Sequence, residues 1–155
     1  MAELSNRARV GDAFDLLAQC LKPFVSRHMA RTVSRGQDWA AVFAASAKPP
    51  ITDYSTDDPV FLLRIMADCW RGTFDRQLPR GSRNLVFTLR DKRNEWAHNR
   101  QIKLHDALYT LSGIVTLVEA VDASAAEPVR AMLDDLRLTQ FERAGGSDRN
   151  AALTS

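Results

Sequence analysis

The sequence predicts an all-α fold, a helical bundle, and two observations carry this prediction. Apolar residues recur at steps of three and four along several long segments, which is the period of a helix with one face in a core. No segment shows the period of two that marks a half-buried strand, and no internal repeat is apparent. With 155 residues the chain is long enough to form one domain around its own core.

The first helix is expected over about residues 7–33. Its apolar stripe consists of Val10, Phe14, Leu17, Leu21 and Phe24. Pro23 lacks an amide hydrogen and crowds the carbonyl of residue 19, so we expect a kink or break over residues 19–22.

The next segment, residues 34–57, would be an unusually long loop for a compact domain, so part of it should be folded. Asp38 can cap a short helix over 39–47, which Pro49 and Pro50 then end. Asp58 and Pro59 suit the N-cap and first position of another helix. That helix is expected to run until Pro79 and Gly81, with a stripe of Leu62, Ile65, Met66, Cys69, Trp70 and Phe74.

Three more helices complete the expected bundle. One starts near Ser82 and has an inward stripe of Leu85, Val86, Leu89, Arg93, Trp96 and Ala97. Another spans about 103–121, and a shorter one begins at Pro128. Residues 144–155 have no periodicity, so the predicted organisation is a helical domain over 1–143 and a flexible tail or linker over 144–155.

Charge is unevenly distributed along the chain. Residues 71–103 hold nine basic and three acidic side chains, a net +6, whereas the remainder has 12 basic and 16 acidic ones, a net −4. A basic stretch suits a polyanion such as RNA, although an arginine-rich solvated helix face would look the same. Two cysteines on helical stripes and the absence of a signal-peptide pattern favour a reduced, cytoplasmic location. The apolar runs are too short for a membrane span.

Arg93 and His98 are the candidate catalytic residues. Arg93 falls on an apolar stripe, between Leu89 and Trp96, where it should be partly desolvated. A structural role is the alternative, with the side chain extended past the core or paired with the carboxylate of Asp91, Glu95 or Asp106. His98 is about 140° around an ideal helix from Arg93. The two could converge if the helix ends near Ala97, or if a second subunit completes the site.

The segment RNEWAH, residues 93–98, resembles the motif of HEPN nucleases, in which arginine is followed after four to six residues by histidine. Asn94 occupies the place where that motif has Asn, Asp or His. Flanking blocks over residues 10–25, 57–74 and 84–98, together with Trp39, resemble the branch found in an endonuclease of nuclear messenger-RNA surveillance. The resemblance covers about residues 7–121. In bacteria, similar modules are found at the N-terminus of large ATPases or helicases, many of them associated with phage defence.

This resemblance implies a HEPN-like antiparallel bundle of four to five main helices with a short extra helix. It also implies a homodimer in which two motif helices meet and form a metal-independent ribonuclease site. His98 would transfer protons, Arg93 would stabilise charge on the phosphate, and Asn94 would orient one of them. RNA would be held by Arg90, Lys92 and Arg100. Arg100 stands where adenylylated HEPN toxins have tyrosine, so control by that modification is not expected.

The other candidate sites have simpler explanations. His105 and His28 are expected at the surface, His28 alternatively as a capping residue, and three aspartates are expected to cap or flank turns: Asp53, Asp57 and Asp58. Cys69 has no zinc-ligand spacing to either His98 or His105, so no metal and no cofactor is expected. The competing functional hypothesis is a non-catalytic HEPN module that dimerises or docks RNA for a larger ATPase or defence protein. Nucleotide binding without cleavage is a third.

Overall fold

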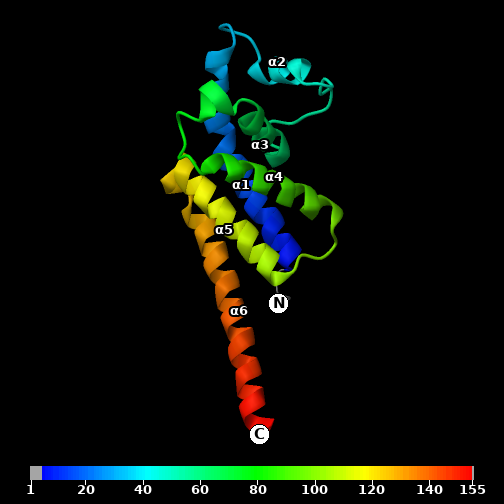
Figure 1. The fold of residues 1–155 in the computed structure, drawn as a ribbon, viewed down its shortest axis with the longest axis vertical. Helices are drawn as coiled ribbons and strands as arrows, with labels where there is room; N and C mark the ends of the chain where they lie inside the picture. The colour runs from blue at the N-terminus through cyan, green and yellow to red at the C-terminus, as the bar shows by residue number, and fades with distance from the viewer. Residues whose placement is uncertain (1–4, 155) are drawn as a thin grey trace.

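The computed structural model describes the backbone of residues 5–154 and the side chains of residues 5–145. Within these residues every regular element is helical, which confirms the predicted all-α bundle (Figure 1). The helices are α1 (Asn6–Met29), the short α2 (Trp39–Ser46), α3 (Pro59–Asp68), α4 (Ser82–His98), α5 (Leu104–Val121) and α6 (Glu127–Thr154). Single turns η1 (Ala30–Thr32), η2 (Trp70–Phe74) and η3 (Ala123–Ala125) lie between them.

The core lies where α1 meets α3 and α5, with α4 and α6 packed around them. Fully buried side chains from three helices meet there, among them Leu17, Ile65 and Leu111. Helices α5 and α6 lie side by side in opposite directions, and α4 crosses the bundle (Figure 1). The amphipathic stripes therefore face one another as their period predicts.

Helix α5 also satisfies the length and composition of a membrane span, with a mean hydropathy of 1.2 over its 18 residues. Its apolar side chains are those of a core helix, because it packs against α1, α4 and α6.

The expected break near Pro23 is wrong. Helix α1 continues through Pro23 to Met29, and only the turn η1 follows it, so the helix also ends before residue 33. Proline removes one amide hydrogen bond from the helix. The surrounding residues Leu21, Phe24 and Val25 are buried in the core, and this burial holds the helical backbone across the defect.

The helix expected to continue to Pro79 ends earlier, at Asp68. Gly72 has φ +83°, a left-handed conformation that a right-handed helix cannot contain, and the chain forms the wide turn η2 there. The amide of Asp75 donates to the carbonyl of Trp70 at 2.9 Å across this turn. Trp70 and Phe74 are still buried, so the sequence correctly predicts their packing but not the backbone between them.

Both predicted aspartate caps are confirmed. Asp38 accepts from the amides of Ala40 and Ala41 at the start of α2, and Asp58 accepts from the amide of Val60 at the start of α3. Pro59 occupies the first turn of α3, where its missing amide costs no helical hydrogen bond.

The last helix is much longer than predicted. It runs from Glu127 to Thr154, so the segment from residue 144, expected to be irregular, is helical up to Thr154. Its second half extends well beyond the other helices (Figure 1). The division into a domain over 1–143 and a tail over 144–155 stays a prediction.

Candidate functional site

Arg93 is half-buried near the C-terminal end of α4, as its place on the stripe predicts. Its guanidinium carbon lies 4.6 Å from the centroid of the Trp96 ring, within cation–π range. Among the residues the structure describes, none of the three expected carboxylates, those of Asp91, Glu95 and Asp106, forms an ion pair with Arg93, and two of them, Glu95 and Asp106, pair with Lys92 instead. The hydrogen-bond donors of the guanidinium are thus available to an anion.

Trp96 is fixed in place by the N-terminal turn of α1. Its Nε1–H donates to the carbonyl of Arg7 at 2.8 Å, and the guanidinium carbon of Arg7 lies 4.4 Å from the ring centroid. The indole also lies against Gly11, where a β-carbon would come within 2.8 Å of Cζ2. One aromatic ring therefore contacts two guanidinium groups, those of Arg7 and Arg93.

Arg7 also holds the end of α4. Its Nε donates to the carbonyl of Asn99 at 3.0 Å, just beyond the helix, and its second terminal nitrogen lies 3.5 Å from the carbonyl of Trp96. An arginine on these carbonyls satisfies acceptors that a helix end leaves free. The sequence did not single out Arg7, although it stands three residues before Val10 and so continues the stripe of α1.

His98 is the last residue of α4 and is exposed. Among the described residues its side chain has no hydrogen-bond or ion-pair partner. The helix ends at His98 with Asn99 as its C-cap, close to the end near Ala97 that the sequence allowed, but its helical backbone still includes both Arg93 and His98. Arg93 and His98 therefore project about 140° apart around α4.

Two other residues of the motif are at the surface. Asn94 is exposed and stands one helical turn before His98, so the two share a face of α4. Ala97, expected on the inward stripe, is exposed, because the inward face of this last part of the helix is taken by Arg93 and Trp96.

The three predicted RNA contacts have different surroundings. Lys92 Nζ lies 3.3 Å from Glu95 Oε2 and 3.8 Å from Asp106 Oδ1, so two carboxylates offset its charge. Arg90 is half-buried and Arg100 is exposed, and within the described part of the chain neither forms an ion pair. Of the three, the two arginines have the less compensated charge.

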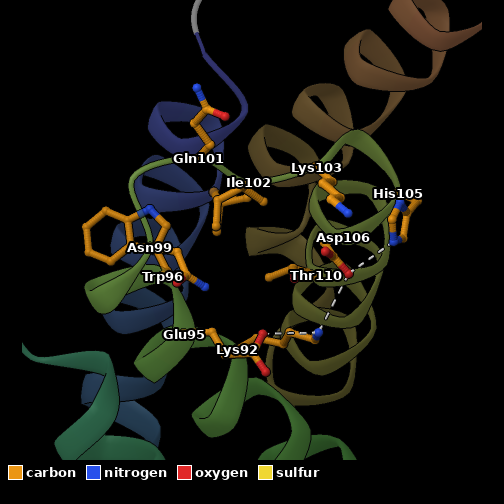
Figure 2. A pocket seen from close by; sticks show the side chains of 11 residues that line it. Lys92, Glu95, Trp96, Asn99, Gln101, Ile102, Lys103, His105, Asp106 and Thr110 are labelled. Carbon is orange, nitrogen blue, oxygen red and sulfur yellow. Dashed lines mark hydrogen bonds and ion pairs between the residues drawn. The ribbon is translucent and has the colours of Figure 1, made fainter.

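A cavity of about 230 Å³ lies between the end of α4 and the start of α5 (Figure 2). Lys92, Glu95 and Asp106 meet on one side of it, and His105 Nε2 lies 3.5 Å from Asp106 Oδ1. His105 is otherwise at the surface, as predicted. Neither Arg93 nor His98 lines this cavity, so it is separate from the predicted catalytic pair.

A second cavity, of about 330 Å³, lies beside the loop that joins α4 to α5. Its basic lining comes from Arg7, Arg100 and Arg143, which belong to three separate parts of the chain. Arg100 thus lies in a basic hollow. Arg7, which also contacts the Trp96 ring, is part of the lining of this hollow. This gathering of arginines cannot be seen in the basic stretch over 71–103, because two of the three lie outside it.

His28 is not the surface or capping residue that the sequence suggested. It is only 8% exposed, and its ring lies edge to face against Phe24 at 4.8 Å and Phe74 at 6.2 Å between centroids. Burial lowers the pKa of His28, and the nearby charges of Arg31 and Arg27 lower it further. The signal was its position four residues after Phe24, on the apolar stripe.

Both cysteines are half-buried free thiols. Burial, with a smaller effect from Asp122, raises the pKa of the Cys20 thiol to about 11. Burial and Asp68 also raise the pKa of Cys69. No group of three or more His, Cys, Asp or Glu side chains with metal-binding geometry occurs among the described residues.

Comparisons with known proteins place these observations in a family. The family model described as Swt1-like HEPN matches residues 12–122, more than half of the chain. The matched region runs from the first turns of α1 to the end of α5 and includes the whole of α4. Comparisons with curated proteins and with solved structures gave no match.

Proposed function

Because the chain belongs to the Swt1-like HEPN family, we propose that it is a metal-independent endoribonuclease whose active site forms between two copies of the chain. Arg93, Asn94 and His98 are the proposed catalytic residues. One observation carries the proposal: Arg93 and His98 lie at the same end of one helix, and among the residues that the structure describes neither side chain has an ion-pair partner. The Arg93 guanidinium contacts the Trp96 ring, and within the described residues its N–H donors remain available to a phosphate.

The geometry of α4 supports the two-chain arrangement. An uninterrupted helix from Ser82 to His98 holds Arg93 and His98 about 140° apart, so one copy presents them in different directions. If a second α4 packs against the first about a twofold axis, each helix faces the other and residues from both meet in one cleft. Phe87 is 40% exposed on the outer side of α4 and provides an apolar contact for such packing.

The proposed reaction is transfer of a phosphodiester within RNA. The ribose 2′ oxygen loses its proton and bonds to phosphorus, the bond from phosphorus to the 5′ oxygen breaks, and that oxygen takes up a proton. His98 accepts and donates these protons, and Arg93 stabilises the negative charge that develops on the phosphate oxygens. Asn94 orients one of these groups. The products are a 2′,3′-cyclic phosphate and a 5′-hydroxyl end.

RNA binding is proposed to depend on Arg90 and Arg100, with a smaller role for Lys92. The two arginines have no carboxylate partner within the described residues, whereas Glu95 and Asp106 offset Lys92. An uncompensated cation releases more counterions from a phosphate backbone when it binds. Arg7 adds charge to the hollow around Arg100.

The test is incubation of purified protein with single-stranded RNA in excess EDTA. Wild-type protein is expected to give cyclic-phosphate ends, and both His98→Ala and Arg93→Ala should remove this activity. His105→Ala is the matched control, since it is another exposed histidine, seven residues further on, and should retain activity. Activity that needs a divalent cation, or that survives His98→Ala, would contradict the proposal.

A mixing experiment tests whether two copies form one site. Arg93→Ala and His98→Ala proteins are each expected to be inactive, but their mixed dimer contains one copy with an intact arginine and one with an intact histidine. If each dimer has two equivalent sites, random mixing should restore about one quarter of wild-type activity. No restoration, despite exchange of subunits shown by a labelled chain, would mean that both residues act within one copy.

The second candidate function is a non-catalytic module that docks RNA or dimerises for a larger ATPase or defence protein. The observation that favours it is on α6, where Leu138 is 55% exposed and Phe141 is 74% exposed, three residues apart on one face. Exposed large apolar side chains on an extended helix suit a protein contact. Intact RNA in the cleavage assay, together with a dimer that persists in His98→Ala but is weakened in Leu138→Ser protein, would support this alternative.

A further inference from the structure

A third cavity, of about 250 Å³, lies at the opposite end of α1 from Trp96. It is formed by the end of α1, the turn η1, and the turn η2 with the residues that follow it. Its lining consists of His28, Arg31, Thr32, Gly72, Thr73, Arg76 and Gln77. Arg7 and His28 are 21 residues apart in one uninterrupted helix, which corresponds to about 30 Å. The cavity is therefore distinct from the proposed ribonuclease site.

His28 lines this cavity with a polar side chain that is almost fully buried. The residue is 8% exposed, and no described residue forms a hydrogen bond with either ring nitrogen. Among the described side chains, however, no fully enclosed polar atom lacks a partner. The unpaired nitrogens of His28 must therefore reach solvent, and the cavity is the solvent-filled space that His28 lines. A buried imidazole usually satisfies its nitrogens within the protein, so this arrangement points to a ligand.

The charged side chains of the cavity are uncompensated. Arg31 and Arg76 are exposed, and within the described part of the chain neither forms an ion pair. Asp75 stands nearby in sequence, but its Oδ1 accepts from the amide of Gly72 at 3.1 Å and Asp75 does not line the cavity. Two arginines without a carboxylate partner suit a group with several anionic oxygens.

The neutral donors of the cavity fit the same group. The Thr73 hydroxyl and the Gln77 side-chain amide have hydrogens with no acceptor in the described residues, whereas the Thr32 hydroxyl already donates to the carbonyl of Met29 at 2.6 Å. Because burial and the charges of Arg31 and Arg27 lower the pKa of His28, its imidazole is neutral near pH 7 and keeps one N–H donor. The cavity is thus lined by guanidinium, hydroxyl, amide and imidazole donors, and its lining contains no carboxylate.

We propose that this cavity binds a phosphate group, with Arg31 and Arg76 as its charge partners and His28 as a hydrogen-bond donor at its buried side. The phosphate belongs either to a small phosphomonoester or to the backbone of an RNA strand. The volume accommodates a phosphate and part of the sugar that carries it, because one water in the liquid occupies about 30 Å³.

The test is a titration of the full chain with inorganic phosphate, followed by the NMR signals of the His28 ring at constant pH and ionic strength. Wild-type protein is expected to show a saturable shift. Arg31→Gln and Arg76→Gln should each weaken binding about tenfold, because each removes a charge-assisted hydrogen bond. Arg35→Gln is the matched control, since Arg35 is an exposed arginine of the next loop that does not line the cavity.

His28→Phe tests the histidine separately. Phenylalanine keeps an aromatic ring against Phe24 and Phe74, so a fold checked by circular dichroism should persist while phosphate affinity, measured by calorimetry, falls. No saturable shift in wild-type protein, or an equal loss in Arg35→Gln and Arg76→Gln, would overturn the proposal.

The source of the phosphate is distinguished in a His98→Ala background, where RNA should stay intact. One arm uses a nucleoside monophosphate, and the other uses a single-stranded RNA with hydroxyl groups at both ends. If only the monophosphate displaces inorganic phosphate, as followed by the His28 signal, the ligand is a terminal phosphate. Competition by the RNA identifies the backbone. Competition by neither would contradict the proposal.

Discussion

Trp96 lies so close to Gly11 that a β-carbon on Gly11 would be 2.8 Å from Cζ2 of the indole. The glycine is therefore required by a contact between helices rather than by its own backbone, which is helical. The same indole contacts the guanidinium of Arg93. A small residue in α1 thus sets the position of a candidate catalytic residue in α4.

Gly11→Ala tests this contact. Alanine normally stabilises the interior of a helix by about 0.5–1 kcal/mol relative to glycine. Here the clash with Trp96 should reverse the sign and lower the free energy of unfolding by about 1–3 kcal/mol, as overpacking does. Gly145→Ala is the control, because Gly145 is also helical and no heavy atom lies within 4 Å of its added carbon. Urea unfolding of both variants measures the difference, and a Gly11→Ala protein as stable as wild type would disprove the close contact.

Trp96→Phe tests whether the indole positions Arg93. The exchange removes the Nε1–H that donates to Arg7, and the smaller ring no longer fixes the guanidinium of Arg93. Cleavage of RNA at saturating substrate should fall about ten- to a hundredfold, since misplaced catalytic groups have effects of that size. Trp39→Phe, at another half-buried tryptophan, should leave the rate unchanged. Equal rates in the two variants would mean that Arg93 is positioned without Trp96.

Lys92 and Arg100 should differ as RNA contacts. Two carboxylates neutralise Lys92, so Lys92→Gln should change RNA affinity less than Arg100→Gln. In a His98→Ala background, Arg100→Gln should also reduce the slope of log K against log salt concentration by about 1. Filter binding over a salt series measures both effects. A larger loss with Lys92→Gln would show that the lysine exchanges its protein partners for RNA.

The lowered pKa of His28 predicts a dependence of stability on pH. Between its folded pKa and its unfolded value near 6.5, the unfolded chain binds more protons than the folded one, so stability falls as pH falls through that window. The contribution is fully present above pH 6.5. Thermal unfolding from pH 7.5 to 5 should show this loss, and His28→Phe should reduce it. An identical pH profile in the variant would assign the loss to other groups.

Cys20 should be an unreactive thiol. With a pKa of about 11, only about one thousandth of it is thiolate at pH 8, and the thiolate is the reactive form. Iodoacetamide followed by peptide mass spectrometry should therefore modify Cys20 far more slowly in the folded protein than in urea. Equal rates in the two states would show that burial does not protect it.

Local patterns predicted that each main helix exists, and two of the helix starts, better than they predicted the helix ends. Asp38 and Asp58 marked two helix starts to the residue, because capping is a contact between neighbours in sequence. Gly72 was missed as the end of a helix, since glycine is compatible with both a helical and a left-handed backbone and the apolar stripe continues past it.

The candidate site was only partly predictable. Arg93 could be found because it is a charged residue on an apolar stripe. Arg7, which contacts the same Trp96 ring, is 89 residues from Trp96 in sequence, and no local period predicts such a contact. Arg7 and His28 both continue the spacing of the α1 stripe at its two ends. Polar residues that extend an apolar stripe were thus the signal available in the sequence.

The separation of Arg93 and His98 around α4 has a consequence for control of the proposed enzyme. If one copy of the chain cannot assemble the site, the rate of cleavage at low abundance varies with the square of the chain concentration. Doubling the protein then quadruples the activity. Any fused or bound partner that holds two copies together raises their effective concentration. Cleavage is then activated by that partner and no longer by an increase in the amount of protein.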